Sequence, residues 1–568
     1  VKNKNKISVC FVNVNVNLHT HLERKNLGIE YLASVLNSRG YTADCLYCDK
    51  LALMSKLETL ISENDIKVIG FSCMQDNVYV IQNSIKYLKS KYPHIVFIVG
   101  GAQAVALGKE FIHDSGVDYI MVGESENYIT ELMDFIIYHK GNIEEINNIC
   151  YLNTKGEFVR NPQGKLICQL DNLPFPNYVL KNDDSLTYAG IITGRGCPFK
   201  CAFCYQGAKE KTVRYRSLDN VFEEISLLIK NNKNVKMIQF YDDTFTLDAN
   251  RVREFCNRMK KIYEEFGIRW ICEIHCQTVY DKPELLKLMV EAGLNEAQIG
   301  IESGDNTILK KLNKTITSDM IIQTVENCKK AGIYMLEGNI MLGAAGETKE
   351  QLEANFDFAE QLIIAGKGMI QIYPVLLWPF PNTPITLNPS KYGVKIIEEQ
   401  CEYTVNCISN CVSESESVTR QEFVEYYYQL RDRISEVYSK VACTLNAQEA
   451  GKHWFNGSFT FVEQWGRSLS AIKYMNTFFI AKGKNNVDLS DDNVYPVRTF
   501  DIHSYKDNML YLRESDLLIE TFDSRILEIC NGKNNVKEIA ERLGADIKTI
   551  HERLFALEDK MLVYGSAI

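Results

Sequence analysis

Three cysteines in one short segment constrain this chain more than any other feature. Cys197, Cys201 and Cys204 are spaced as CxxxCxxC. Cysteine thiolates are the usual ligands of iron-sulfur clusters, and three thiolates on a four-iron cube leave one iron open to bind a substrate. With 18 cysteines in 568 residues, chance would produce this spacing in only about two chains per hundred. The segment therefore predicts a catalytic metal centre held by these three thiolates.

The residues around the cysteines narrow the prediction. Gly194 and Gly196 precede the first thiol, and the aromatic Phe203 precedes the last. The segment resembles the cluster-binding loop of the radical S-adenosylmethionine (SAM) superfamily, CxxxCxΦC, in which Φ is aromatic. The resemblance implies a 4Fe-4S cluster whose open iron binds the amino and carboxylate groups of SAM. It also implies an electron donor, such as a flavodoxin or ferredoxin, because an electron from the cluster cleaves SAM to methionine and a 5′-deoxyadenosyl radical.

The net charge and the lack of long apolar segments disfavour a nucleic-acid-binding protein and a membrane protein. A chain of 568 residues predicts several domains, and a net charge of -10 gives no electrostatic reason to expect nucleic acid as a partner. The N-terminus lacks the apolar region of a signal peptide, and no segment approaches 18 uninterrupted apolar residues, so we expect a cytoplasmic protein without a membrane contact.

Residues 1–145 alternate between strand and helix patterns. Residues 68–72 and 95–99 are short apolar runs, whereas residues 28–38 and 78–90 have helical periodicity. Such alternation predicts an α/β fold with a doubly wound parallel sheet, whose ligands bind at the carboxyl ends of the strands. The candidate ligand-binding residues at those ends are Ser72, Gly100, Gly101, Gly123 and Glu124.

This segment also resembles the Rossmann-like cobalamin-binding domain that precedes many radical SAM cores. The resemblance rests on residues 27–33, 70–72, 99–104 and 117–124, and it implies cobalamin as a third cofactor. Domains with a histidine on cobalt carry DxHxxG after the first strand, but here Asn17 replaces the aspartate and no glycine closes the motif. We therefore expect no histidine ligand to cobalt and interpret His19 and His21 as loop residues.

After a turn-rich linker at residues 146–187, residues 188–390 contain six strand candidates that alternate with helices. Six such units predict a partial (β/α)6 barrel of the TIM type, in which the chemistry collects at the carboxyl ends of the strands. Two acidic residues, Asp242 and Asp243, follow the second strand with Tyr241 before them. They either cap the next helix or, by the family resemblance, belong to the segment that binds the amine of SAM.

The family resemblance implies further cofactor-binding residues. Glu302 and Ser303 match a motif at the fourth strand that contacts ribose and carboxylate, and Gly338 and Gly343 match the adenine motif GxIxG loosely, with one extra residue. Arg214 follows the cysteines and suits either a cofactor carboxylate or a structural ion pair. The predicted cofactor contacts of the core are Tyr241, Asp243, Glu302, Ser303, Gly338, Gly343 and Arg214.

The C-terminal part has a different character. Residues 391–495 are predicted to be largely helical, and residues 496–568 show a winged-helix pattern with helices at 516–530, 536–543 and 547–559. Residues 515–568 carry ten acidic and seven basic side chains, which disfavours DNA. The pattern resembles the winged-helix domains that recognise leader peptides of ribosomally made natural products by pairing a peptide with a sheet edge.

Together these features favour a cobalamin-dependent radical SAM enzyme that modifies an unactivated carbon. The most specific hypothesis is C-methylation of a ribosomally synthesised peptide. Two alternatives stay open: a cyclase or oxidase in which cobalamin donates no methyl group, and a non-enzymatic iron-sulfur or cobalamin-linked sensor. The cysteines of the N-terminal segment do not follow the pattern of a methylthiotransferase.

Overall fold

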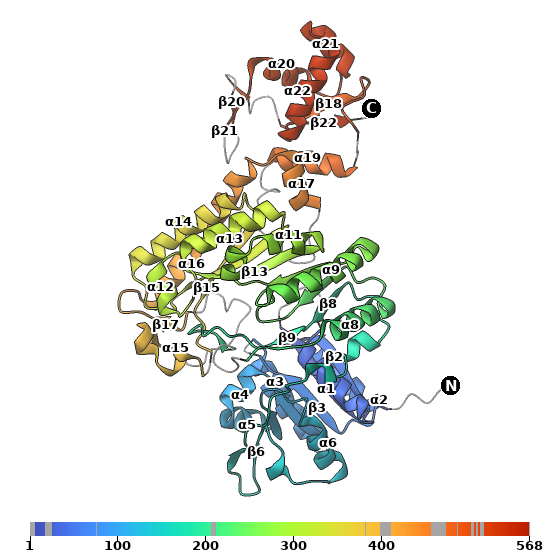
Figure 1. The fold of residues 1–568 in the computed structure, drawn as a ribbon, viewed down its shortest axis with the longest axis vertical. Helices are drawn as coiled ribbons and strands as arrows, with labels where there is room; N and C mark the ends of the chain where they lie inside the picture. The colour runs from blue at the N-terminus through green and yellow to red at the C-terminus, as the bar shows by residue number, and fades with distance from the viewer. Residues whose placement is uncertain are drawn as a thin grey trace, which may run out of the picture.

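The protein has three parts that follow one another along its long axis (Figure 1). In that view the N-terminal domain lies at the bottom, the core in the middle and the C-terminal unit at the top. The computed structural model describes residues 6–16, 25–74, 76–205, 212–380, 382–397, 411–455, 473–484, 487–500, 505–506, 509–511 and 516–566.

The N-terminal domain is built on a seven-stranded sheet of order β2-β1-β3-β4-β5-β6-β7. The first five strands in this order pair in parallel, and β6 and β7 are antiparallel. The doubly wound sheet is thus confirmed, and it extends past the expected boundary at residue 145. The elements are β1 Val9–Asn15, α1 Leu27–Ser38, β2 Ala43–Asp49, α2 Leu53–Glu63, β3 Val68–Ser72, α3 Val78–Lys91, β4 Val96–Gly100, α4 Ala102–Leu107, α5 Lys109–Ser115, β5 Tyr119–Met121, α6 Ile129–Tyr138, β6 Ile149–Leu152 and β7 Phe158–Arg160.

The core contains a six-stranded parallel sheet of order β15-β14-β13-β12-β11-β8, as the sequence predicts. One face of each strand packs under the helices in a single apolar core that includes the fully buried Trp270 and Phe240. The elements are β8 Tyr188–Ile191, β9 Gly194–Arg195, β10 Arg214–Tyr215, α8 Leu218–Asn231, β11 Met237–Phe240, α9 Ala249–Phe266, β12 Arg269–Glu273, α10 Cys276–Asp281, α11 Glu284–Glu291, β13 Leu294–Glu302, α12 Asn306–Lys311, α13 Ser318–Ala331, β14 Met335–Leu342, α14 Lys349–Ala365 and β15 Ile370–Leu376.

A long helix, α16 Arg420–Ala442, joins the core to the C-terminal unit. Its buried face packs against β15 and α14, and the Tyr438 hydroxyl donates a hydrogen bond to the carbonyl of Ile370. The helix is capped by Thr419, which accepts from the amide of Glu422 while the Glu422 carboxylate accepts from the amide of Thr419. The outer edge of the barrel sheet is thereby covered by the helix that leads into the last part of the chain.

The C-terminal unit places three helices beside two small sheets. The helices α20 Thr521–Ile529, α21 Val536–Leu543 and α22 Ile547–Asp559 agree with the expected order. Residues 516–518 were predicted as the start of a helix but form strand β21, because they pair with β20 in an antiparallel sheet. The other elements are α17 Ala447–Phe455, α19 Lys473–Lys484, β18 Tyr495–Arg498, β19 Tyr505–Lys506, β20 Met509–Tyr511 and β22 Val563–Ser566.

Candidate active site

The three cysteines lie in a loop that leaves the core after β8. The loop is closed at its base, where β9 and β10 pair in an antiparallel ladder. The amide of Ala202 donates to the carbonyl of Leu312 at 2.9 Å, which attaches the loop to the end of α12. Cys197, Cys201 and Cys204 are half-buried, whereas most other described cysteines are buried in apolar surroundings. The three predicted ligands are thus held together on one anchored loop and remain accessible.

The chemistry of these thiols fits a cluster. In the described part of the chain no three His, Cys, Asp or Glu side chains are close enough to bind one metal ion together. A 4Fe-4S cluster does not require such a group, because each cysteine thiolate binds a different iron atom. Burial raises the pKa of Cys201 to about 11, and the nearby Lys314 opposes that rise. Cluster binding would therefore displace a proton from Cys201.

The loop after β11 supports the cysteine loop. The carboxylate of Asp242 accepts hydrogen bonds from the amide and hydroxyl of Thr193 at 2.6 and 2.5 Å. Asp243 accepts from the amide of Gly196 at 3.2 Å, one residue before the first cysteine. The N-cap of the following helix is Asp248, so neither Asp242 nor Asp243 caps it. Contact of Tyr241 or Asp243 with SAM stays a prediction.

The fourth core strand ends in a buried ion pair. Glu302 is 6% exposed, and its backbone has a φ of 64° in the left-handed region. Its Oε1 accepts from Lys314 Nζ at 3.1 Å, and a Cβ at Gly300 would lie 2.5 Å from that ammonium. Ser303 Oγ and the amide of Gly304 approach Asn355 Oδ1 at 3.2 and 2.8 Å. The predicted residues Glu302 and Ser303 are thus preorganised at a strand end, a strained position typical of functional sites.

Sequence reasoning did not single out Lys314. It lies in the turn after α12, with a side chain that is 8% exposed. Charged groups are seldom buried unless they are paired, and its ammonium lies within electrostatic reach of Cys201 and Cys276 as well as Glu302. Lys314 therefore adds a buried positive charge between the cysteine loop and the end of the fourth strand.

Gly338 in the fifth strand and Gly343 just after it are glycines for different structural reasons. A Cβ at Gly338 would lie 2.3 Å from Ile301 Cδ1, so packing against β13 requires glycine there. Gly343 has a φ of 84° and begins the loop after β14. The buried carboxylate of Glu347 accepts from the amide of Ala345 at 3.3 Å and holds that loop in shape. An adenine contact by Gly338 or Gly343 remains a prediction.

A polar layer crosses the face of the core sheet opposite the helices. The register pairs Glu273 with Gln298, Gln298 with Glu337, and Glu337 with Gln371. Side chains at one height on neighbouring parallel strands share a face. Gln371 is buried, whereas Glu273, Gln298 and Glu337 are at least partly exposed. Barrel interiors are usually filled by branched apolar side chains, so these three residues are a candidate substrate surface that sequence periodicity did not reveal.

Two groups at the carboxyl end of β12 have shifted pKa values. Burial and the neighbouring carboxylates of Asp243 and Asp242 raise the pKa of Glu273 to about 7. The Glu273 side chain is nevertheless accessible to solvent from the open face of the sheet. Burial and the charge of Lys314 lower the pKa of His275 to about 4, so its imidazole is neutral at pH 7. Shifted groups at strand ends are typical of active sites.

The carboxyl ends of the N-terminal strands form a glycine-rich rim. A Cβ at Gly123 would meet no atom within 4 Å, and one at Gly100 would meet Met121 only at 3.9 Å. Gly101 instead approaches the carbonyl of Cys73 so closely that a Cβ would lie 2.2 Å from it. Ser72 Oγ accepts from Asn26 Nδ2 at 2.9 Å. The rim is open at Gly100 and Gly123, so a large ligand can approach the backbone there.

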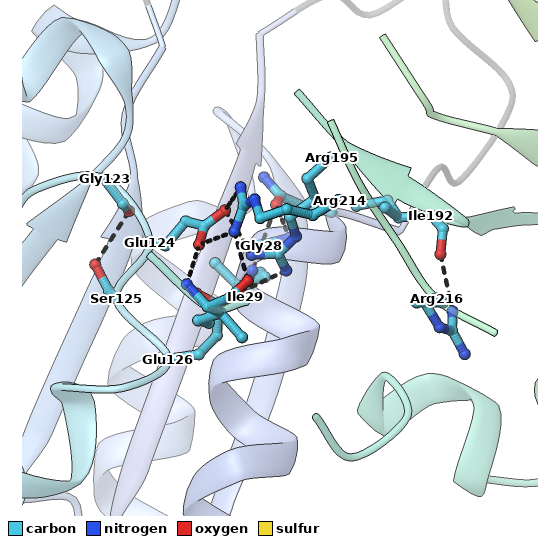
Figure 2. A network of polar contacts seen from close by, with 12 residues as sticks. Gly28, Ile29, Gly123, Glu124, Ser125, Glu126, Ile192, Arg195, Arg214 and Arg216 are labelled. Carbon is cyan, nitrogen blue, oxygen red and sulfur yellow. Dashed lines mark hydrogen bonds and ion pairs between the residues drawn. The ribbon is translucent and has the colours of Figure 1, made fainter. Parts of the chain in front are cut away.

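A network of ion pairs joins this rim to the cysteine loop (Figure 2). Arg214 donates to both carboxylate oxygens of Glu124, at 2.7 and 2.9 Å. Arg195 lies 3.3 Å from Glu124 and donates to Glu126 at 2.7 Å. The arginines lower the pKa of Glu124 against the effect of its burial. Two predicted cofactor-binding residues, Arg214 and Glu124, therefore bind each other, and the carboxyl ends of the two sheets face one another.

Comparisons with known proteins agree with this arrangement. A model of the radical SAM superfamily matches residues 191–359, and a model of the B12 binding domain matches residues 16–133. The chain belongs to the cobalamin-dependent radical SAM family. Its fold matches the solved cobalamin-dependent S-adenosylmethionine radical enzyme OxsB, with aqua-cobalamin and S-adenosylmethionine bound, at a TM-score of 0.63 and 17% identity over 84% of this chain and 71% of OxsB.

Two curated relatives of this radical SAM enzyme differ in activity. An uncharacterised methyltransferase of Pyrococcus horikoshii is 28% identical over 431 residues, which cover 72% of this chain and 90% of that protein. An anaerobic magnesium-protoporphyrin IX monomethyl ester cyclase of Rubrivivax gelatinosus is 24% identical over 348 residues, which cover 58% of this chain and 61% of the cyclase. Both a methyltransferase and a cyclase are therefore among its relatives.

The family assignment establishes the cofactors of the enzyme as a 4Fe-4S cluster, SAM and cobalamin, and it excludes the hypothesis of a non-enzymatic sensor. His19 and His21 lie outside the described residues, so the absence of a histidine on cobalt stays a prediction. None of the described helices is both long and apolar enough to span a membrane.

Proposed function

We propose that this enzyme methylates an sp3 carbon of a ribosomally synthesised peptide. The observation that carries the proposal is the apposition of two strand-end surfaces. Glu124, one residue after Gly123 on the rim of the N-terminal domain, pairs with Arg195 and Arg214 at the base of the cysteine loop. These ion pairs support an arrangement in which the two cofactors face each other. The cofactors supply radical formation and a methyl group, and the protein supplies their orientation and the exclusion of water.

A methyltransferase that is 28% identical to this chain over most of its own length supports methyl transfer. The cyclase relative favours the alternative, in which the substrate is cyclised or oxidised without gaining a methyl group. SAM carrying a deuterated methyl group distinguishes the two. We expect the label in the product, with both S-adenosylhomocysteine and 5′-deoxyadenosine formed. An unlabelled product of equal or lower mass, without S-adenosylhomocysteine, would favour the cyclase.

The C-terminal unit is the proposed recognition site for a leader peptide. Strand β21 is the outer strand of the sheet β19-β20-β21, and an edge strand can pair with an extended peptide. The excess of acidic side chains in residues 515–568 disfavours a nucleic acid as the ligand. A reductant such as a flavodoxin or ferredoxin is the second proposed partner, because radical formation needs one electron from outside the protein.

On this proposal, the position of the C-terminal unit requires a minimum length of the substrate peptide. Helix α17 lies at the amino ends of the core strands, where Glu449 pairs with Lys367 and, with Leu445, lines a cavity of about 440 Å³ beside Arg269 and Asn295. The cysteine loop lies at the opposite ends. Strand β13 has nine residues, so a peptide must span roughly 30 Å, or about ten extended residues, between the recognised segment and the modified carbon.

Truncation tests the recognition site. Removal of residues 505–568 should lower turnover of the full peptide strongly, while SAM cleavage without peptide remains. The isolated leader segment, added in excess, should inhibit the intact enzyme and leave the truncated one unaffected. Peptides with spacers shortened below about ten residues should bind without being methylated. Equal turnover of the full peptide by both proteins would contradict the assignment.

A further inference from the structure

The base of the cysteine loop carries two like charges on neighbouring positions. In the β9–β10 ladder Arg195 lies opposite Arg214. These residues precede the first cysteine by two positions and follow the last one by ten. Like charges directly opposite one another destabilise a strand pair. The ladder that closes the loop therefore needs anions nearby.

Both anions come from the N-terminal domain. Glu124 lies between the two guanidinium groups, and Glu126 binds Arg195. The four side chains are 8–18% exposed, so their charges are largely removed from solvent. The main chain of the linker joins the same group, because Arg214 donates to the carbonyl of Ile167 and the amide of Ile167 donates to Glu124. We name these four charged residues the interdomain clamp.

Other contacts besides the clamp also dock the two domains. Helix α1 places Leu27 and Tyr31 in the apolar core of the barrel domain. The buried Glu30 accepts from the amide of Tyr178 at 2.9 Å. The two sets of contacts meet at Tyr31, because the guanidinium of Arg195 lies over its ring, 5.6 Å from the centroid. In the described structure none of these three residues hydrogen-bonds to the main chain of the cysteine loop. Glu30 is bound instead to Tyr47 and Tyr178 and lies outside the clamp.

We propose that Glu124 and Glu126 are positioning residues that close the base of the cysteine loop and fix the cluster relative to the corrinoid. Glu124 is adjacent to Gly123 on the open rim and is bound to both strands that bracket the cysteines. One short loop of the N-terminal domain, with Gly123 and Glu124, thereby contacts the corrinoid and also anchors the cysteine loop that binds the cluster.

Hydrogen exchange of the full chain without cofactors tests the anchorage. The variant Glu124→Gln keeps the shape but loses the charge, and Glu30→Gln is a matched control that changes another buried carboxylate at the same interface. We expect amide exchange of residues 194–196 and 214–216 to accelerate roughly 10- to 100-fold in Glu124→Gln, since hydrogen bonds to charged groups are lost. The control should leave these amides unchanged.

If Glu124→Gln fails to fold, Glu126→Gln removes only the Arg195 contact and should give a smaller acceleration confined to residues 194–196. In the loaded enzyme, the magnetic interaction between the reduced cluster and cob(II)alamin should weaken or broaden in either variant and not in Glu30→Gln. Unchanged exchange and an unchanged magnetic interaction would overturn the proposal. Equal effects of Glu30→Gln would overturn it as well, because they would assign the effect to docking. Neither measurement depends on methyl transfer.

Discussion

The imidazole ring of His275 lies flat on the phenyl ring of Phe199, with ring centroids 3.8 Å apart and an interplanar angle of 6°. Phe199 lies between the first and second cysteines, and His275 follows β12 at the carboxyl end of the core sheet. Nδ1 of the imidazole is buried without a hydrogen-bond partner. The stacking thus joins the cysteine loop to a second strand end through a neutral ring.

Replacement of His275 tests the stacking. His275→Ala should lose the ring contact, worth about 0.5–1.5 kcal/mol, and should lower the iron content after anaerobic reconstitution. His275→Phe restores a flat ring and should keep the iron content of the wild type. If the phenylalanine variant loses iron as the alanine variant does, the imidazole has a role beyond stacking.

Removal of the cysteines tests the metal centre. The triple variant Cys197→Ala, Cys201→Ala, Cys204→Ala should lose the cluster and all reductive SAM cleavage, since the wild type should bind about four irons. Cys256→Ala, which changes a buried cysteine of helix α9, is the control and should keep both the cluster and SAM cleavage. Formation of 5′-deoxyadenosine by the triple variant would refute the assignment.

Variants of the Glu302–Lys314 ion pair distinguish an effect on protein stability from an effect on SAM binding. Glu302→Gln or Lys314→Met alone leaves a buried charge without its partner and should destabilise the protein by about 3–5 kcal/mol. The double variant should recover much of this loss, because neither charge remains. All three variants should bind SAM more weakly. Urea unfolding and equilibrium binding of SAM measure the two effects, and full SAM affinity in the double variant would make the pair purely structural.

The raised pKa of Asp242 predicts that the stability of the protein depends on pH. Burial raises its pKa from 3.8 to about 6 in the folded protein. A raised pKa means that the folded state holds the proton more tightly, so the contribution to stability is present below about pH 4 and is lost as the pH rises through 6. The difference in unfolding free energy between Asp242→Asn and the wild type should therefore shift by about 2 kcal/mol in favour of the variant from pH 4 to pH 7. A shift of zero would mean that Asp242 titrates normally.

The cobalt centre should lack a histidine ligand, because the segment that would supply it departs from DxHxxG at Asn17. Electron paramagnetic resonance of the cob(II)alamin form should show no nitrogen hyperfine splitting along the axial direction. A splitting that disappears in His19→Ala or His21→Ala would identify the ligand that the sequence argues against.

Much of the fold follows from local sequence patterns. The strand at 68–72 and the six core strands are predictable because each strand has its own local pattern of apolar residues. The cluster ligands are predictable because the three cysteines lie close together in one loop. The prediction failed at Asp516–Leu518, where pairing with β20 overrides a helix-like continuation into α20.

The site was less predictable than the fold, since its decisive contacts join residues far apart in the chain. Arg195 and Glu126 are separated by 69 residues, and no local pattern predicts that they meet. Arg214 and Glu124 were each recognised as functional candidates, but only the folded chain shows that they bind one another. Lys314 was missed because a single lysine after a helix has no distinguishing spacing.

Helix α16 also has a consequence for how such enzymes diversify. It covers the edge strand β15 with a buried face and the Tyr438 hydrogen bond, so this edge of the barrel sheet is already protected where the helix ends at Ala442. A different unit joined after that residue would inherit a barrel whose β15 edge is not exposed to aggregation. On the proposed role of the C-terminal unit, its exchange would give one catalytic core a new substrate without a change in its chemistry.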